Sequence, residues 1–300
     1  MNPGKMKTLL AVLICLVSSP VLAQTNCPDR AREVAPQLPA ETRREFEGKL
    51  DEARVRFEKE RGSADNVIWY GRRTAYLGRY KDAIRIFTEG IKQFPTDARL
   101  YRHRGHRLIT LRCFDAAITD LEKAATLIKG KADEIEPDGL PNARNIPTST
   151  LQSNIFYHLG LAYYLKGDFR RALTAYRAAE KVSTNPDMLV ATTHWLYMTL
   201  RRLGREKEAA GALARIKDNL DVIENADYYK LIDVYKDKLK ADDLLTSDAD
   251  SLSNATMGYG IGNWFLYNGR RAEAEELFRR IIAGNQWSSF GYIAAEAELK

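Results

Sequence analysis

The chain has 300 residues, of which 45% are hydrophobic and 29% are charged. This composition is typical of a folded globular protein and excludes collagen-like and intrinsically disordered chains. The formal net charge of +6 is modest for a chain of this length.

The N-terminal stretch 1–23 has the three parts of a secretory signal peptide. Lys5 and Lys7 precede an apolar run at residues 9–17, and Ala23 ends a short exit segment. We therefore expect cleavage after Ala23 and a periplasmic or secreted mature protein. Cleavage lowers the net charge to +4, which is too little to indicate a nucleic-acid partner. No second run of eighteen apolar residues follows, so we expect no transmembrane segment in the mature chain.

Two cysteines remain after such a cleavage, Cys27 and Cys113. In an oxidising compartment two cysteines can form a disulfide. A bond between them would attach the N-terminal segment to the middle of the chain, whereas the alternative is two unpaired thiols. The sequence leaves both alternatives open.

Residues 24–62 form an N-terminal segment that ends in an amphipathic helix. Phe46, Leu50, Ala53 and Phe57 recur at helical spacing and share one face. We expect this helix to cap the structure that follows, because its apolar face needs a neighbour to cover it.

The remainder of the chain contains an internal repeat. A small or aromatic residue is followed by alanine twelve positions later and by a bulky residue after four more. A glycine also lies seven positions after the first marker, except in the second unit, which has Arg112. The five copies are Gly71-Ala83-Phe87, Gly105-Ala117-Leu121, Gly160-Ala172-Tyr176, Tyr197-Ala209-Leu213 and Gly262-Ala274-Phe278.

This pattern resembles the tetratricopeptide repeat (TPR), a helix-turn-helix unit of 34 residues. Gly71 and Gly105 are 34 positions apart, and the match in units one and three runs through VIWYGRRTAYLGRYKDAIRIFTEGIKQFP and FYHLGLAYYLKGDFRRALTAYRAAEKVSTNP. The resemblance implies an all-α fold, an α-solenoid with terminal capping helices. Units one and two occupy residues 63–129, units three and four 153–218, and unit five with a C-terminal capping helix 253–300.

The spacing has a physical explanation. The leading glycine and the later alanine allow the two helices of a unit to approach closely, and the bulky residue fills the gap beside them. We expect the glycine seven positions later, such as Gly78, to end the first helix in a left-handed conformation.

Two segments interrupt the repeats. Residues 130–152 contain Pro137, Pro141 and Pro147 and are predicted to form an inserted loop. We expect the acidic EIEPD sequence within this loop to be solvated.

Residues 219–252 are long enough for a degenerate helical unit. Tyr228, Leu231, Ile232, Tyr235 and Leu239 lie on one face of a predicted helix.

The resemblance also implies where a partner binds. First helices of TPR units line a concave groove, and one side of each predicted first helix gives a lining that is cationic at the N-terminal end and aromatic in the middle. The candidate groove residues are Arg72, Arg99, Arg102, His106, Tyr157, Tyr164, His194, Arg201, Tyr259 and Asn263.

Between Ala64 and Arg112 there are eleven Lys or Arg residues and four Asp or Glu residues. Arginines recognise carboxylates through paired hydrogen bonds, so this groove would suit an extended or helical peptide with acidic groups. The alternative is that the arginines form only a solvated surface.

Motifs for catalysis, metals and cofactors are absent from the sequence: it has no HExxH, GxSxG or P-loop. His103 and His106 share a helix flank, but no Cys, Asp or Glu accompanies them locally, so we expect no metal site. The GYGIGN run at 258–263 lacks the third glycine of a nucleotide-binding fingerprint. We expect no cofactor.

These observations favour a non-enzymatic scaffold for protein–protein interaction in the bacterial cell envelope. The alternative is an accessory protein that binds a small ligand or an envelope polymer against Tyr157, Tyr164 and Tyr259. An enzyme is compatible with the sequence only through an unrecognised site in the loop at 130–150.

Overall fold

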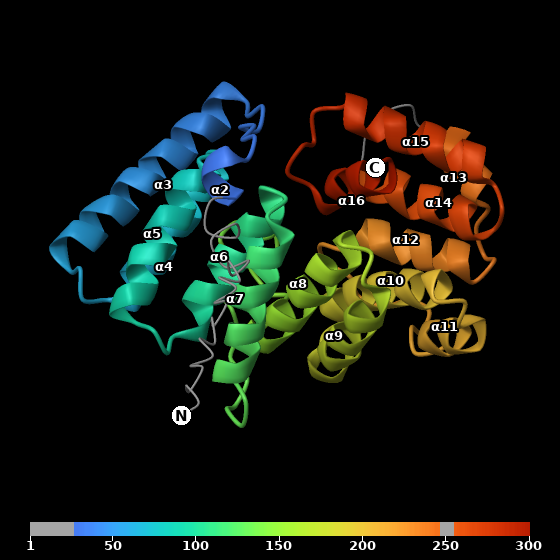
Figure 1. Cartoon of the computed structure of the whole chain (residues 1–300), viewed down its shortest axis with the longest axis horizontal. Helices are drawn as coiled ribbons and strands as arrows, with labels where there is room; N and C mark the ends of the chain where they lie inside the picture. The colour runs from blue at the N-terminus through green and yellow to red at the C-terminus, as the bar shows by residue number, and fades with distance from the viewer. Residues whose placement is uncertain (1–26, 247–254) are drawn as a thin grey trace, which may run out of the picture.

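The computed structural model describes residues 27–246 and 255–300 (Figure 1). The signal-like stretch 1–23 lies outside the described residues. Fifteen helices and no strand lie within the described part of the chain. The helices are α2 (Cys27–Arg30), α3 (Ala40–Lys59), α4 (Ala64–Tyr76), α5 (Tyr80–Gln93), α6 (Ala98–Thr110), α7 (Phe114–Leu127), α8 (Leu151–Leu165), α9 (Phe169–Val182), α10 (Pro186–Arg202), α11 (Glu206–Leu213), α12 (Ala226–Tyr235), α13 (Ala241–Thr246), α14 (Ala255–Tyr267), α15 (Arg271–Ala283) and α16 (Phe290–Glu298).

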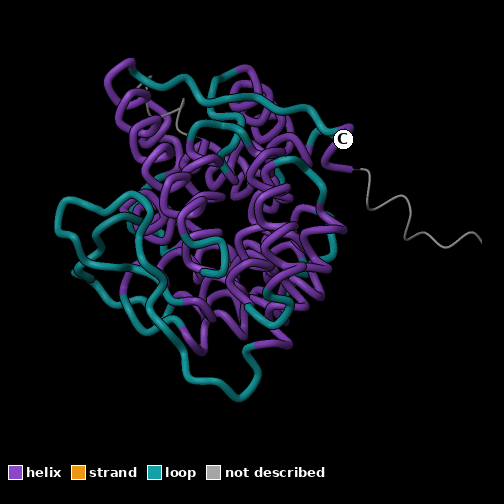
Figure 2. The backbone as a smooth tube through the Cα atoms, turned by 90° about the vertical axis from the view of Figure 1, so that its left-hand side faces the viewer, coloured by secondary structure: helices purple, strands orange, loops and turns teal. Residues whose placement is uncertain are grey.

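Five antiparallel hairpins make up the body of the fold. They are α4 with α5, α6 with α7, α8 with α9, α10 with α11, and α14 with α15. Each hairpin contacts the next one along the chain. Between the fourth and fifth hairpins, α12 packs against both α10 and α14. This arrangement confirms the predicted all-α solenoid. Most loop segments lie around the edge of the helical stack in Figure 2.

The repeat markers lie where the two helices of a hairpin meet. A Cβ placed on Gly160 would lie 2.7 Å from the ring of Tyr176, and one on Gly262 would lie 2.6 Å from that of Phe278. The alanines of all five copies are fully buried, at 0% exposure. The small residues therefore permit close approach of the helices, as their spacing predicts.

The turns between the helices of each hairpin also agree with the sequence. Gly78, Gly167, Gly204 and Gly269 have φ angles between 68° and 84°. Arg112, at the position where the second unit lacks glycine, adopts the same left-handed conformation with φ 63°. This conformation disfavours side chains with a Cβ, so the arginine must be held there by its contacts.

Both ends of the described chain attach to the second hairpin. A disulfide joins Cys27 to Cys113, 86 positions apart, with a Cα–Cα distance of 5.8 Å. From the other end, Glu296 forms an ion pair with Arg112 at 2.7 Å, and the main-chain oxygen of Trp287 accepts a hydrogen bond of 2.9 Å from the same guanidinium. The helical stack is therefore closed upon itself near the α6–α7 turn.

The capping helix at the N-terminal end matches its prediction. Phe46, Leu50 and Ala53 of α3 are buried, and Phe57 stacks on Tyr70 of α4 with ring centroids 5.3 Å apart. The α3 helix therefore packs against α4 of the first hairpin.

In the degenerate unit the helix is shorter than predicted. It ends at Tyr235, because Asp237 adopts a left-handed φ of 57°, and Leu239 is 40% exposed. The remaining apolar residues of α12, among them Leu231 and Ile232, are buried.

Candidate functional site

Five of the candidate groove residues are buried inside the C-terminal half of the fold. Tyr164 on α8 accepts hydrogen bonds from Asn263 Nδ2 at 2.7 Å and from Tyr259 Oη at 2.9 Å. Asn263 is 0% exposed and Tyr259 is 1% exposed. Tyr259 Oη also reaches Glu298 Oε1 of α16 at 3.1 Å. These side chains connect α8, α14 and α16, so they hold the structure together and do not line an open groove.

Tyr157 and His194 are enclosed in a similar way. Tyr157 Oη lies 3.4 Å from Tyr228 Oη of α12. His194 Nδ1 lies 3.1 Å from Tyr235 Oη, and the imidazole stacks on Tyr228 with centroids 4.5 Å apart. Burial lowers the pKa of His194 to about 3, so its ring is neutral at neutral pH.

The expectation of an aromatic groove is therefore corrected. The α12 and α16 helices pack over the first helices of units three to five, and spacing within a repeat unit does not reveal this covering. The alternative of a small ligand or envelope polymer held by Tyr157, Tyr164 and Tyr259 loses its binding surface for the same reason.

Arg99 and Arg201 are engaged with other groups of the chain. Arg99 forms ion pairs with Asp97 and Asp65, both at 2.6 Å, and the paired carboxylates raise the pKa of its guanidinium. Arg201 donates a hydrogen bond to Tyr197 Oη at 3.2 Å and lies over the Tyr267 ring, with Cζ 4.5 Å from the centroid. The charge of Arg99 is therefore offset by two carboxylates, and the guanidinium of Arg201 is stacked on an aromatic ring.

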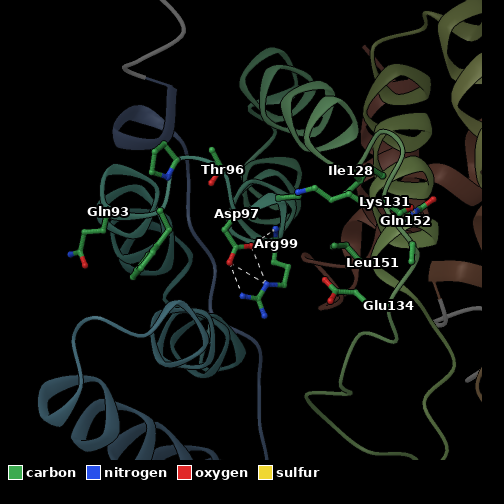
Figure 3. A pocket seen from close by; sticks show the side chains of 13 residues that line it. Gln93, Thr96, Asp97, Arg99, Ile128, Lys131, Glu134, Leu151 and Gln152 are labelled. Carbon is green, nitrogen blue, oxygen red and sulfur yellow. Dashed lines mark hydrogen bonds and ion pairs between the residues drawn. The ribbon is translucent and has the colours of Figure 1, made fainter.

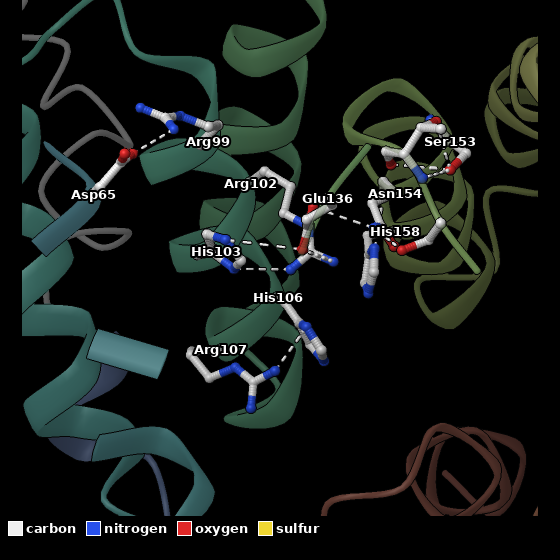
Figure 4. A network of polar contacts seen from close by, with 12 residues as sticks. Asp65, Arg99, Arg102, His103, His106, Arg107, Glu136, Ser153, Asn154 and His158 are labelled. Atoms are coloured by element: carbon white, nitrogen blue, oxygen red, sulfur yellow. Dashed lines mark hydrogen bonds and ion pairs between the residues drawn. The ribbon is translucent and has the colours of Figure 1, made fainter. Parts of the chain in front are cut away.

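The other basic groove residues surround one small cavity at the N-terminal end. We call it the arginine pocket. Its volume is about 130 Å³, and its lining comes from α4, α5, α6 and the inserted loop. Figure 4 shows part of this lining, with Arg102, His103, His106, Arg107 and Glu136. The lining residues are Arg72, Ala75, Tyr76, Phe87, Arg102, His103, His106, Arg107 and Glu136.

Glu136 enters this pocket from the inserted loop, which corrects the expectation that the EIEPD sequence is solvated. It is only 9% exposed, its Oε1 lies 3.0 Å from Arg102 Nη2, and its Oε2 accepts a hydrogen bond of 3.2 Å from Asn154. Two main-chain hydrogen bonds anchor the loop on either side: Glu136 N donates to Ser149 O, and Leu151 N donates to Glu134 O. The carboxylate is therefore a fixed part of the pocket wall.

Arg102 and His103 form the buried side of the pocket. Arg102 is 6% exposed and donates from Nη1 to His103 Nδ1 at 2.9 Å. Its Nε has no hydrogen-bond partner among the described residues. Burial, followed by the charge of Arg102, holds the pKa of His103 well below its usual range, so His103 contributes no charge at neutral pH.

Arg107 and His106 are half-buried residues of the same pocket wall. Arg107 donates from Nη2 to His106 Nδ1 at 2.6 Å, as the dashed line in Figure 4 shows. Burial lowers the pKa of Arg107 to about 10, and burial and then the charge of Arg107 hold the pKa of His106 well below its usual range. No ion pair is formed by Arg107 or Arg72 within the described ranges.

Two charged residues of the pocket, Arg107 and Glu136, were not among the candidates from the sequence. Arg107 lies one position beyond the helix side that was sampled, although the excess of basic residues between Ala64 and Arg112 indicated the region. Glu136 carried no signal, because its burial depends on how a long loop folds back onto α6.

A second opening lies on the adjacent edge of the molecule (Figure 3). This cleft has a volume of about 640 Å³ and is formed by the α5–α6 turn, the end of α7 and the start of α8. Apolar residues such as Phe94, Ile128 and Leu151 alternate in its wall with both basic and acidic side chains. It is larger than the arginine pocket, but it has no excess of one charge.

Across residues 27–246 and 255–300, no helix is both long and apolar enough to cross a membrane. In the same part of the chain, no group of three or more His, Cys, Asp or Glu residues is placed to hold a metal ion.

Comparison with known proteins places one repeat in a family. Residues 153–186 match the sequence profile of the tetratricopeptide repeat. No curated protein matches the chain.

Several solved structures have a similar arrangement of helices. One is YrrB, described as a TPR protein with an unusual peptide-binding site. It is 16% identical to this chain with a TM-score of 0.44, and the match covers 83% of this chain and 98% of YrrB. MamA is 16% identical with a TM-score of 0.44, over 74% of this chain and 93% of that one. A thermophilic TPR protein of Thermus thermophilus is 15% identical with a TM-score of 0.40, over 79% and 100%.

Proposed function

We propose that this chain, an all-α solenoid in which one repeat matches the tetratricopeptide profile, is a non-enzymatic scaffold that binds a protein or peptide segment in the bacterial cell envelope. The proposed contact is the concave side of α4 and α6 at the arginine pocket. The partner segment is acidic.

One observation carries this proposal. Arg72 and Arg107 face a small open cavity, and within the described residues neither forms an ion pair with a carboxylate. Most other arginines of the N-terminal hairpins are already paired, as Arg99 is with Asp97 and Arg104 with Asp120. Arg72 lies over the Trp69 ring and Arg107 contacts His106, but in the described part of the chain neither charge is offset by a carboxylate, so both are suited to carboxylates of another molecule.

The proposed location has separate support. Disulfides persist in oxidising compartments and are rare in the bacterial cytoplasm, and Cys27 is bonded to Cys113. The signal-like stretch 1–23 agrees with export. Cell fractionation with mass measurement of the N-terminus tests this point. Recovery of the uncleaved chain from the cytoplasm would contradict it.

The binding proposal is tested by affinity capture from a native envelope extract. We compare the wild-type chain with Arg72→Glu and with a matched control, Arg85→Glu. Arg85 lies on α5 with its side chain 67% exposed, and both substitutions change the net charge equally. We expect a partner that wild type and Arg85→Glu retain, that Arg72→Glu loses, and that added salt releases. Equal retention by all three chains would refute the proposal.

A further inference from the structure

We propose that the arginine pocket binds one doubly charged oxyanion of the size of phosphate or sulfate. The inference rests on the proposed function for the choice of face, and it names the chemical group that would be held there. Three observations support it: unpaired charge, an unpaired buried donor, and a cavity of matching size.

The charges in the pocket leave an excess that two negative charges would offset. Arg72, Arg102 and Arg107 contribute guanidinium groups, while the histidines are neutral. Glu136 pairs with Arg102, and its Oε1 also lies 3.8 Å from Nε2 of the neutral His103. The inserted loop has a second carboxylate near the pocket, that of Asp138. It interacts with the charge of Arg72, but the two side chains do not form an ion pair. A single carboxylate would still leave Arg72 or Arg107 without a partner.

The donors in the pocket are also incomplete. Arg102 Nε is buried and unpaired, although its two Nη atoms face His103 and Glu136. A buried N–H without an acceptor costs free energy, so the hydrogen bonds of this guanidinium are incomplete. The fork geometry of guanidinium suits paired hydrogen bonds to such oxygens.

The size of the cavity restricts the ligand. Its volume is about 130 Å³, so it is a small cavity and not an extended groove. An ion of the size of phosphate or sulfate fits this space.

The inserted loop gives the pocket its fixed shape. Arg73 Nη1 donates to Gly139 O at 2.7 Å, and a Cβ on Gly139 would lie 2.8 Å from Arg72 Nη2. The loop backbone therefore packs against Arg72, and the loop side chain Glu136 packs against Arg102. Because both guanidinium groups are held from the same loop, the site is preorganised for a small anion.

The test is calorimetric titration of the purified mature chain at pH 8 and low ionic strength with inorganic phosphate and with sulfate. Acetate at equal ionic strength represents a single carboxylate. Glycerol phosphate distinguishes a free ion from a phosphate group carried on a larger molecule. Arg72→Gln is compared with the outer-face control Arg85→Gln, and Arg107→Gln replaces Arg72→Gln if the latter does not fold.

We expect one saturable site for phosphate and sulfate and affinity about tenfold weaker for acetate. The pocket variant should weaken phosphate binding by about tenfold and the control by less than about twofold. Tighter binding of glycerol phosphate than of phosphate identifies a phosphate monoester as the ligand, and equal binding identifies the free ion. Absence of saturable phosphate and sulfate binding with a Kd below about 10 mM, or equal weakening by both variants, overturns the inference.

This result is separable from partner capture. If the chain captures a partner but binds neither anion, the proposed function stands and the anion site is refuted. If the chain binds phosphate at Arg72 but captures no partner, the anion site stands and the proposed function is refuted.

Discussion

Asn263 of α14 donates a hydrogen bond of 2.7 Å to Tyr164 of α8, although the two residues are 99 positions apart in the chain. The same amide nitrogen donates to Tyr259 Oη at 2.8 Å, so one buried side chain serves two phenol oxygens from different repeats. This contact joins units that are not consecutive, and nearest-neighbour stacking does not supply it.

Replacing Asn263 by alanine should therefore destabilise the fold. The substitution removes the donor to two buried phenol oxygens and leaves a cavity, so we expect a loss of about 1–3 kcal/mol in the free energy of unfolding. Urea denaturation measures it. Asn268→Ala is the control, because that amide is exposed and bonds only within its own neighbourhood and to Arg201. Equal stability of the two variants would show that the buried contact contributes nothing.

Gly160 tests the close approach of the helices. A Cβ there would lie 2.7 Å from Tyr176, so Gly160→Leu should overpack the hairpin and cost roughly 1–3 kcal/mol, lowering the melting temperature. Gly48 on the exposed face of α3 has no atom within 4 Å of such a Cβ, and Gly48→Ala should stabilise the chain by roughly 0.5–1 kcal/mol. An unchanged melting temperature for Gly160→Leu would contradict the register of the repeats.

The Cys27–Cys113 disulfide closes a long loop. For a sequence separation of 86 residues, the chain-entropy relation gives a stabilisation of roughly 4–5 kcal/mol. We expect Cys27→Ser with Cys113→Ser to unfold at a lower denaturant concentration by a corresponding amount. Thiol titration of the unfolded, non-reduced mature chain should find no free thiol. Two thiols per chain would rule out the bond.

Arg112 provides a test of backbone strain. At its φ of 63° a Cβ is unfavourable, so Arg112→Gly should be more stable than Arg112→Ala by about 1 kcal/mol. Both variants lose the ion pair with Glu296, so their difference isolates the backbone. At Arg280, an exposed position within α15, the order should reverse, because alanine favours a helix over glycine. The same order at both positions would refute the argument.

The buried His194 makes stability depend on pH. Its pKa is lowered to about 3 in the folded state and is near 6.5 when unfolded, so the unfolded chain binds the proton first as pH falls. Stability contributed by the neutral ring is complete above about pH 6.5 and is lost progressively toward about pH 3. We expect His194→Gln to reduce the slope of unfolding free energy against pH by up to about 1.4 kcal/mol per pH unit between pH 6 and 4. Parallel slopes would contradict this prediction.

The sequence predicted much of the fold because the repeat reports short-range packing. The glycine, alanine and bulky residue of each copy lie within one hairpin, so their spacing alone indicates the contact that Gly160 makes with Tyr176. The turn glycines are equally local, and even the exception at Arg112 keeps the left-handed conformation of its counterparts.

The candidate site could be predicted only in its basic half. Arg72 and His106 lie at equivalent positions of successive first helices, 34 residues apart, and Arg102 lies one helical turn before His106. The burial of Tyr164 beneath α16 depends on where the last helix returns in space, and the entry of Glu136 depends on the path of a loop. Neither is encoded in the spacing within a repeat unit, so the sequence could not distinguish a groove residue from a core residue.

Arg112 and Cys113 are consecutive, and through them the earliest described helix and the last helix are fastened to the same turn. Repeat arrays ordinarily tolerate gain or loss of a unit, because each unit contacts only its neighbours. Here an extra hairpin between α8 and α14 would carry Glu296 away from Arg112. The number of repeats in this protein is thus constrained by geometry. Duplication of a unit would break the contact between the last helix and the α6–α7 turn and would not simply lengthen the stack.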